Sequence, residues 1–257
     1  MKILACVKAV YDDQEIFVSS DQTLNYSRSR MIISVYDLNS LAAGRNFAML
    51  TGAEYVALTV GNLNIDDSKM KKNILSRGPG SLYTVADDAI DTLDTHQTAR
   101  VIKDAVEKIG GCDIIICGDG SADVYAQQTG IQLGELLGVP SLNNVTGFEL
   151  QGDKLIVDRA LEDEVQKLQV STPVVLSVSS DICPAQMTSM KDILAAGKKP
   201  ITSWTLSDLG GSEPESSIAV TSIKAPNPAP RMKLINDGSE PAGVQTFLKN
   251  IEKVLAQ

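Results

Sequence analysis

Histidine is nearly absent from this 257-residue chain, whose single copy is His96. A lone imidazole cannot form a multi-histidine zinc site or a catalytic histidine pair, and we expect His96 to be exposed in the first turn of a helix. The four cysteines, Cys6, Cys112, Cys117 and Cys183, include no Cys-x-x-Cys pair. We therefore expect reduced, mostly buried thiols, with no metal ligands among them.

Long apolar runs and an excess of positive charge are also lacking. No apolar run approaches the roughly 20 residues that cross a membrane. The opening run KILACVKAV has the length of one strand and lacks the charged start and cleavage site of a signal peptide. The net charge of −9 argues against nucleic-acid backbones and anionic membrane surfaces as partners. These absences predict a cytoplasmic protein with no membrane insertion and no nucleic-acid partner.

Recognisable catalytic signatures are missing as well. The chain has no G-x-S-x-G elbow, no H-E-x-x-H pair, no Walker A lysine loop and no SGGxDS loop. Asp158 and the run Glu162, Asp163 and Glu164 form an acidic cluster, which fits a solvated hairpin flank better than a metal site. We therefore predict no catalytic residues and no metal ligands, and a nucleotide hydrolase is disfavoured.

Apolar strand patterns alternate with helix patterns over the first 140 residues. Strands are expected at residues 2–10, 53–60, 82–86 and 113–117, with helices after Asn39, from Asp66–Asp67, over 95–109 and from Asp123. Parallel neighbours require crossover connections, so this order predicts an α/β fold with a doubly wound, mainly parallel, Rossmann-like sheet.

Residues 113–140 contain the pattern around which the rest is organised. An apolar strand leads through the glycine turn 118–121 into a predicted helix with Asp123 as N-cap and Gly138 and Pro140 as its stop. A strand, a glycine turn and a helix N-terminus form a typical phosphate site in α/β proteins. The glycines do not match G-x-G-x-x-G, so an ordinary connecting turn is the alternative.

Two further features favour an adenine nucleotide at this edge of the sheet. Strand exits after Val7, Val60 and Cys117 bring glycine or small polar residues to one edge. The polar run 127–129 interrupts a predicted helix that is otherwise apolar. Asp119 and Asp123 would repel a phosphate, so they fit better as a cap or as acceptors for ribose or base, with backbone amides holding the phosphate.

The pattern changes after Pro140. Residues 148–164 predict a hairpin, 172–179 a buried strand, and 186–196 a helix with methionines on one side. A proline-containing tether over 210–231 precedes an amphipathic helix, with Ser239 as its cap. We predict a nucleotide-binding α/β domain over 1–209 and an arm over 210–257. The final helix could fold back or embrace a partner, and the pattern alone does not decide.

The chain resembles the β subunit of electron transfer flavoprotein, in its FixA-like branch. The resemblance covers nearly the whole chain and is carried by KILACVKAVYD, SVYDLNSLAA, LTVGN, LSRGP, CGDGSADVYAQQTGIQLGELLGVP, VDRALEDE, PVVLSVSSD and SMKDILAAGKKPI. It implies an adenine nucleotide alpha hydrolase-like fold and a heterodimer with an α subunit that carries FAD. It also implies that the C-terminal arm reaches over that partner.

The same resemblance implies that this subunit binds AMP or a second FAD. Matching motifs assign the contacts to Cys6, Ser34, Val35, Tyr36, Asp37, Val60, Gly118, Asp119, Gly120, Ser121, Ala122, Asp123, Val124, Tyr125, Ala126, Gln127, Gln128 and Thr129. A dehydrogenase donor would dock on the recognition segment through Met190, Ile193, Leu194, Lys198 and Lys199. Arg159, at the end of the hairpin, is a candidate contact for a partner's flavin or phosphate.

The chain departs from the family pattern at several positions. Asp13 replaces a tyrosine, Glu162 and Asp163 replace a glycine pair, and Thr188 replaces a proline. The QTG ending of the nucleotide loop matches the AMP type, whereas CGDGSAD is nearer to the FAD type, so both nucleotides stay open. The expected function is electron transfer between a dehydrogenase and an acceptor through FAD, without catalysis of its own. The alternative is a stand-alone adenine-nucleotide sensor of the universal-stress type.

Overall fold

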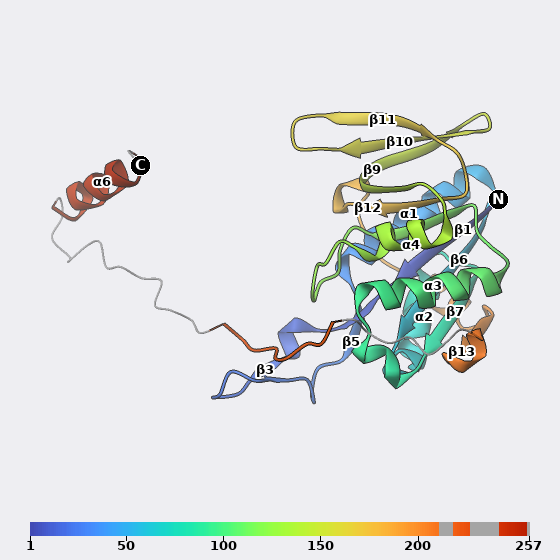
Figure 1. Cartoon of the computed structure of the whole chain (residues 1–257), viewed down its shortest axis with the longest axis horizontal. Helices are drawn as coiled ribbons and strands as arrows, with labels where there is room; N and C mark the ends of the chain where they lie inside the picture. The colour runs from blue at the N-terminus through green and yellow to red at the C-terminus, as the bar shows by residue number, and fades with distance from the viewer. Residues whose placement is uncertain (211–217, 227–241, 256–257) are drawn as a thin grey trace. The chain divides into compact units, whose positions relative to one another are not determined.

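The computed structural model describes residues 1–210, 218–226 and 242–255 (Figure 1). The chain forms two compact units, the first comprising residues 1–16 and 26–221 and the second residues 17–25 and 222–257. In the second unit β3 (Phe17–Val18) pairs antiparallel with β4 (Leu24–Asn25), and α6 spans Ala242–Leu255. Residues 211–217 and 227–231 of the predicted tether, and the predicted helix cap Ser239, lie outside the described residues. The predicted domain boundary at residue 209 stays a prediction.

A nine-stranded sheet forms the centre of the first unit, in the order β11-β10-β9-β12-β8-β1-β6-β7-β13. Neighbours from β9 to β13 along this order are parallel, and β10 and β11 add an antiparallel extension at one edge. The strands are β1 (Lys2–Val7), β6 (Glu54–Gly61), β7 (Ser81–Ala86), β8 (Ile114–Gly118), β9 (Ser141–Gln151), β10 (Lys154–Ala160), β11 (Val165–Val170), β12 (Val174–Val178) and β13 (Ile201–Trp204).

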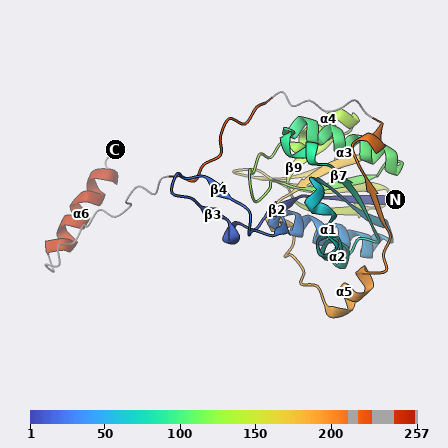
Figure 2. The ribbon, with the colours of Figure 1, turned by 90° about the horizontal axis from the view of Figure 1, so that it is seen from below.

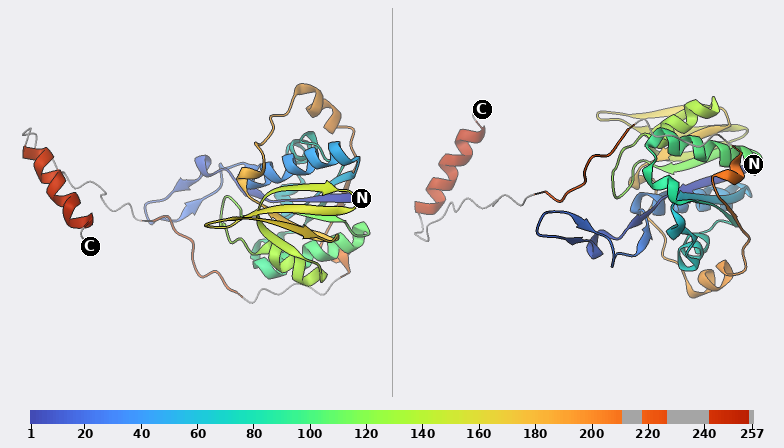
Figure 3. Two further views of the ribbon diagram at one scale, coloured as in Figure 1. Left: turned by 90° about the horizontal axis from the view of Figure 1, so that it is seen from above. Right: turned by 60° about the horizontal axis from the view of Figure 1, so that its bottom comes forward.

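Helices cover both faces of this sheet (Figures 2 and 3). One layer contains α1 (Val35–Thr51), α2 (Ser68–Ser76) and α5 (Met190–Ala196), and the other contains α3 (Thr95–Ile109) and α4 (Thr129–Leu137). Because the central strands are buried on both faces, their sequences are continuous apolar runs rather than alternating ones. The predicted doubly wound α/β fold is confirmed.

Shorter elements complete the first unit. The strands β2 (Ala9–Tyr11) and β5 (Met31–Ile33) pair antiparallel, away from the main sheet. Short 3-10 helices lie at Asp13–Glu15, Leu63–Asp66, Asp88–Thr92, Ser180–Ile182 and Ser207–Leu209. Among the helices of the described residues, none has the length and apolar character that a membrane crossing requires.

The predicted starts of α1 and α5 differ from the structure. The helix α1 starts at Val35, before the predicted start after Asn39, and α5 starts at Met190 instead of Gln186. A capping box explains the start of α5, because the Ser189 side chain accepts from the Asp192 N–H and the Asp192 carboxylate accepts from the Ser189 N–H. The predicted bounds of α3 are correct, since Asp94 caps its start and the left-handed Gly110 ends it.

Candidate functional site

The candidate site lies where β8, β1 and β6 end. Since β1 pairs in parallel with both β8 and β6, the carboxyl ends of the three strands meet at the same edge of the sheet, as predicted. The connections that leave this edge begin at Lys8, after Gly61 and after Gly118. The segments 34–37 and 118–129 are joined here by hydrogen bonds between residues more than 80 positions apart in the chain.

Asp37, in the first turn of α1, joins two of these exits. Its side chain is 5% exposed, and its carboxylate oxygens accept from the Lys8 N–H at 2.7 Å and the Gly118 N–H at 3.1 Å. Burial raises the pKa of Asp37 to about 7, although the two amide hydrogen bonds and the Lys8 charge offset part of that effect. This buried carboxyl therefore fixes the start of the candidate nucleotide loop, residues 118–129.

Lys8 and Ser34 hold the next part of the nucleotide loop. The fully buried Ser34 hydroxyl accepts from the Ala122 N–H at 3.3 Å. The Lys8 ammonium donates to both Asp123 carboxylate oxygens, at 2.7 and 2.8 Å, and the Ser121 hydroxyl also donates to Asp123. Partial burial would raise the pKa of Asp123, but these donors outweigh it and lower the pKa below its usual value.

Asp119 joins the nucleotide loop to the strands β9 and β12. It is buried, and its carboxylate accepts from the Gln127 side-chain amide at 2.8 Å and from the Asn144 N–H at 3.4 Å. Its own N–H donates to the Val178 carbonyl of β12. Both Asp119 oxygens accept hydrogen bonds within the protein, so this residue holds the loop in position, and its predicted contact with ribose or base stays a prediction.

The predicted role of Asp123 as a helix N-cap is wrong. The helix α4 begins at Thr129, and Asp123 lies in an irregular segment before it. Tyr125 and Gln127 have left-handed backbone angles, with φ of 50° and 56°, and a right-handed helix cannot pass through them. The polar run 127–129 consequently precedes or starts α4. Gln128, at the N-cap position, makes no side-chain hydrogen bond to the first turn.

Two glycines allow the close packing of the nucleotide loop. A Cβ atom on Gly118 would lie 2.5 Å from an Asp37 carboxylate oxygen, and one on Gly120 would overlap the Tyr125 ring. The Tyr125 ring in turn packs against Tyr36, with 4.9 Å between ring centroids. The spacing of these glycines therefore follows from contacts inside the protein, and it need not match a dinucleotide fingerprint.

The remaining predicted nucleotide contacts differ in accessibility. Cys6 is buried beside Cys117, and the hydrogen bond between these thiols, together with burial, raises the pKa of Cys6 well above its usual value. A protonated thiol there is a packing group and not a metal ligand. By contrast, Val35, Val124 and Tyr125 are exposed, and Val60 and Ala126 are half-buried.

The predicted docking residues are also of two kinds. Met190 and Leu194 are 73% and 70% exposed, and Ile193 is exposed as well. Lys199 instead donates to the backbone carbonyls of Leu75, at 2.7 Å, and Pro79, at 2.6 Å. The apolar side chains on α5 are thus available to a partner, whereas Lys199 ties the segment to α2. Lys198 is exposed.

The start of α4 offers backbone amides to an anion, whereas Lys8 is paired with Asp123 and the buried carboxyl groups hold the loop. Across residues 1–210, 218–226 and 242–255, no cluster of three or more His, Cys, Asp or Glu side chains could hold a metal ion. Sequence reasoning missed Lys8 and Asn144 as members of this site. The position of Lys8 directly after β1 was an available signal, whereas nothing in the sequence pointed to Asn144.

The stability of the fold should fall as pH rises from 5 to 8 because of Asp37. The unfolded chain releases this proton near pH 4, whereas the folded chain keeps it until about pH 7. Over that window the folded state alone carries the proton, so each unit of pH removes up to about 1.4 kcal/mol. Urea denaturation at pH 5 and 8 should show wild type losing about 2–3 kcal/mol relative to Asp37→Asn. If the two proteins differed in free energy of unfolding by the same amount at pH 5 and pH 8, this titration would be contradicted.

Comparison with known families gives one finding for this arrangement. A family model described as the electron transfer flavoprotein domain matches residues 23–209. The matched region is well over half of the chain and contains α1, the whole nucleotide loop and α5.

Proposed function

This chain belongs to the electron transfer flavoprotein family, and from that membership we propose that it is the β subunit of a heterodimeric electron carrier. It would bind an adenine nucleotide at the candidate site, pair with an α subunit that holds FAD, and dock a dehydrogenase donor. The observation that carries the proposal is the nucleotide loop, held by buried carboxylates and ending at a helix start without a side-chain cap.

The residues present fit an adenosine phosphate. The first-turn amides of α4 receive no side-chain hydrogen bond from Gln128, so they are suited to a phosphate, and the helix dipole favours negative charge there. Lys8 adds a cation that already balances Asp123. Gly130, in the same turn, lies so close to Ser177 that only glycine fits without displacement. These features supply an anion site without requiring a catalytic side chain.

AMP and FAD share this adenosine phosphate, so the loop could serve either one. A flavin, when bound to such a carrier, accepts and releases electrons singly or in pairs. Within this chain, the loop residues would bind and orient the nucleotide. The Arg159 guanidinium donates to the Asn143 backbone carbonyl, at 3.2 Å, and to Asn143 Oδ1, at 2.6 Å, which holds it at the end of β10. Its remaining donors would contact a partner's flavin or phosphate.

Two exposed apolar surfaces would serve the partners. Met190 and Leu194 on α5 offer adaptable side chains to a dehydrogenase. The α6 face of Val244, Phe247 and Leu248 is also exposed and would pack on the α subunit. A stand-alone nucleotide sensor would need neither surface, and the family match does not favour it.

Mass analysis of released nucleotides tests the proposal directly. The chain, co-purified with the proposed α subunit, is expected to yield FAD from the partner and one further adenine nucleotide per heterodimer. Denaturation followed by mass measurement distinguishes AMP from a second FAD in that position. A purified pair that contained no flavin would rule out the electron-carrier function. A pair that contained only the partner's FAD would rule out the nucleotide site in this subunit.

A further inference from the structure

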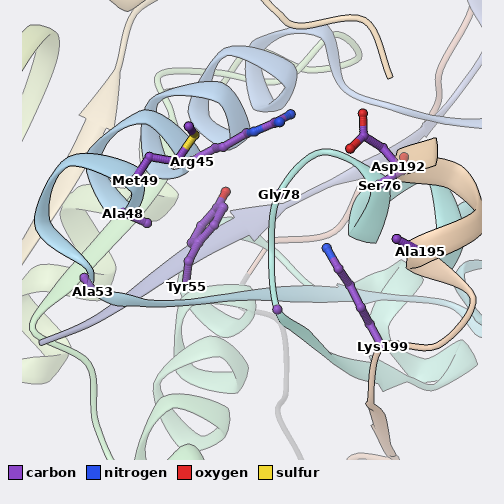
Figure 4. Close-up of a pocket in the computed structure, with 11 residues that line it drawn as sticks. Arg45, Ala48, Met49, Ala53, Tyr55, Ser76, Gly78, Asp192, Ala195 and Lys199 are labelled. Atoms are coloured by element: carbon purple, nitrogen blue, oxygen red, sulfur yellow. The ribbon is translucent and has the colours of Figure 1, made fainter. Parts of the chain in front are cut away.

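A cavity separate from the candidate site lies between α1, the start of β6, the loop after α2 and α5 (Figure 4). Its volume is about 440 Å³. Charged side chains from α1 and from the α5 segment lie on one side, and apolar side chains with the Tyr55 ring lie on the other. The lining residues are Arg45, Ala48, Met49, Ala53, Tyr55, Ser76, Gly78, Gly80, Asp192, Ala195 and Lys199.

Arg45 is the unexplained charge in this cavity. The side chain is half-buried, and within the described part of the chain its guanidinium forms no hydrogen bond and no ion pair within 4.0 Å, although its charge helps to lower the pKa of the nearby Asp192. Its stem lies close against Gly78, where an added Cβ atom would be only 2.9 Å from the Arg45 Cβ. A half-buried guanidinium presents several donors in a planar fork that matches a carboxylate. Arg45 is therefore positioned to receive an anion.

The other two charges of the cavity are largely committed. Lys199 gives two of its three donors to the Leu75 and Pro79 carbonyls, which leaves one donor. The Asp192 carboxylate accepts from the backbone N–H and the hydroxyl of Ser189 through Oδ2 alone, and these bonds together with the nearby Arg45 charge lower its pKa. Two cations and one carboxylate leave a local charge of +1 in a chain whose net charge is −9. A monoanion would balance this charge, whereas a dianion would leave the cavity with a net negative charge.

The opposite wall is apolar and shapes the rest of the ligand. Ala48, Met49 and Ala53 line it, with the ring of Tyr55 between them and the charged side chains (Figure 4). The Tyr55 hydroxyl donates to the Leu41 carbonyl at 2.9 Å, so its proton is not available to a ligand. The cavity thus has a cationic end and an apolar wall.

We propose that this cavity binds a small monocarboxylate with a compact apolar or aromatic body. The carboxylate would lie between Arg45 and the remaining Lys199 donor, and the apolar body would lie against Tyr55 and the two alanines. A bound ligand would connect α1 to the α5 segment. This site is additional to the proposed nucleotide and does not depend on the electron-carrier function.

Calorimetric titration of the full-length chain with benzoate tests this assignment, with benzyl alcohol as the neutral counterpart. A ligand of this size should bind with a Kd of about 1 mM. Benzyl alcohol should bind at least about tenfold more weakly, because it cannot form the charge-assisted hydrogen bonds to Arg45. Amide hydrogen exchange in residues 189–199 should slow when benzoate is present.

Substitutions inside and outside the cavity test whether benzoate binds there. Arg45→Ala should weaken benzoate binding by about tenfold or more, and Arg45→Lys should recover part of the affinity. Lys72→Ala removes one positive charge from the exposed surface of α2, outside the cavity, and should leave the Kd unchanged. Three results would overturn the assignment: no benzoate binding up to about 50 mM, equal binding of benzyl alcohol, or an unchanged Kd in a folded Arg45→Ala variant.

Discussion

Replacing Gly118 by alanine should destabilise the protein and weaken the binding of the proposed nucleotide. The new methyl group would lie 2.5 Å from an Asp37 carboxylate oxygen and 3.1–3.2 Å from atoms of Tyr36, so Asp37 would have to move. Its hydrogen bonds to the Lys8 and Gly118 amides would then weaken in a buried environment. We expect a loss of about 2–4 kcal/mol in the free energy of unfolding, because buried donors would lose their partner.

The nucleotide affinity of the Gly118→Ala variant should fall by about 10- to 100-fold, since the displaced turn leads directly into the nucleotide loop. Urea denaturation and nucleotide content per heterodimer measure the two effects. Gly197→Ala is the matched control, because the nearest atom to its new Cβ is 3.6 Å away and its φ is −65°. This control should change stability by no more than about 0.5 kcal/mol. Normal stability with full nucleotide content in Gly118→Ala would contradict the role assigned to Asp37.

The strands and helices that could be predicted are those whose pattern is local. The strand β8 and the helix α3 were predictable because continuous apolar residues and a 3.6-residue repeat need no knowledge of the rest of the chain. The strand β13 was missed, because the short run Ile201–Trp204 is half polar and adds to the sheet only through its pairing with β7. The strand β11 was missed for a similar reason, since Val165–Val170 alternates and pairs only with β10.

In the candidate site, too, features with a local sequence pattern could be predicted, and features that depend on contacts between distant residues could not. The order of the strands predicted which edge of the sheet carries the site. The glycine turn 118–121 indicated which loop forms it. The start of α4 could not be predicted, because the left-handed Tyr125 and Gln127 are held by tertiary contacts to Tyr36 and Asp119. The Lys8–Asp123 pair joins residues 115 positions apart, and no local pattern indicates such a pairing. Asp37 was named as a contact residue, but only the structure identifies it as a buried link between two strand exits.

Replacing Val244, Phe247 and Leu248 together by serine should strongly weaken association with the proposed α subunit. These side chains lie on one face of α6 and are 52%, 45% and 52% exposed. An exposed face of this kind gains free energy only when another surface covers it. Each side chain buried at an interface contributes about 1.5–3 kcal/mol, so the triple variant should weaken the heterodimer by more than about 100-fold. Analytical ultracentrifugation with the partner measures this loss.

The matched control replaces Gln245, Lys249 and Asn250 by serine. These residues are exposed and lie away from that face of α6. Serine is a weaker helix former than leucine, glutamine and lysine by a few tenths of a kcal/mol and is about equal to valine, phenylalanine and asparagine, so the control loses at least as much helix propensity as the test variant. A difference between them therefore reports the apolar face and not the helix itself. The core of the first unit should unfold at the same urea concentration in both variants. Equal and undiminished association in both would mean that the arm does not hold the partner, and the subunit interface would then have to lie elsewhere on the chain.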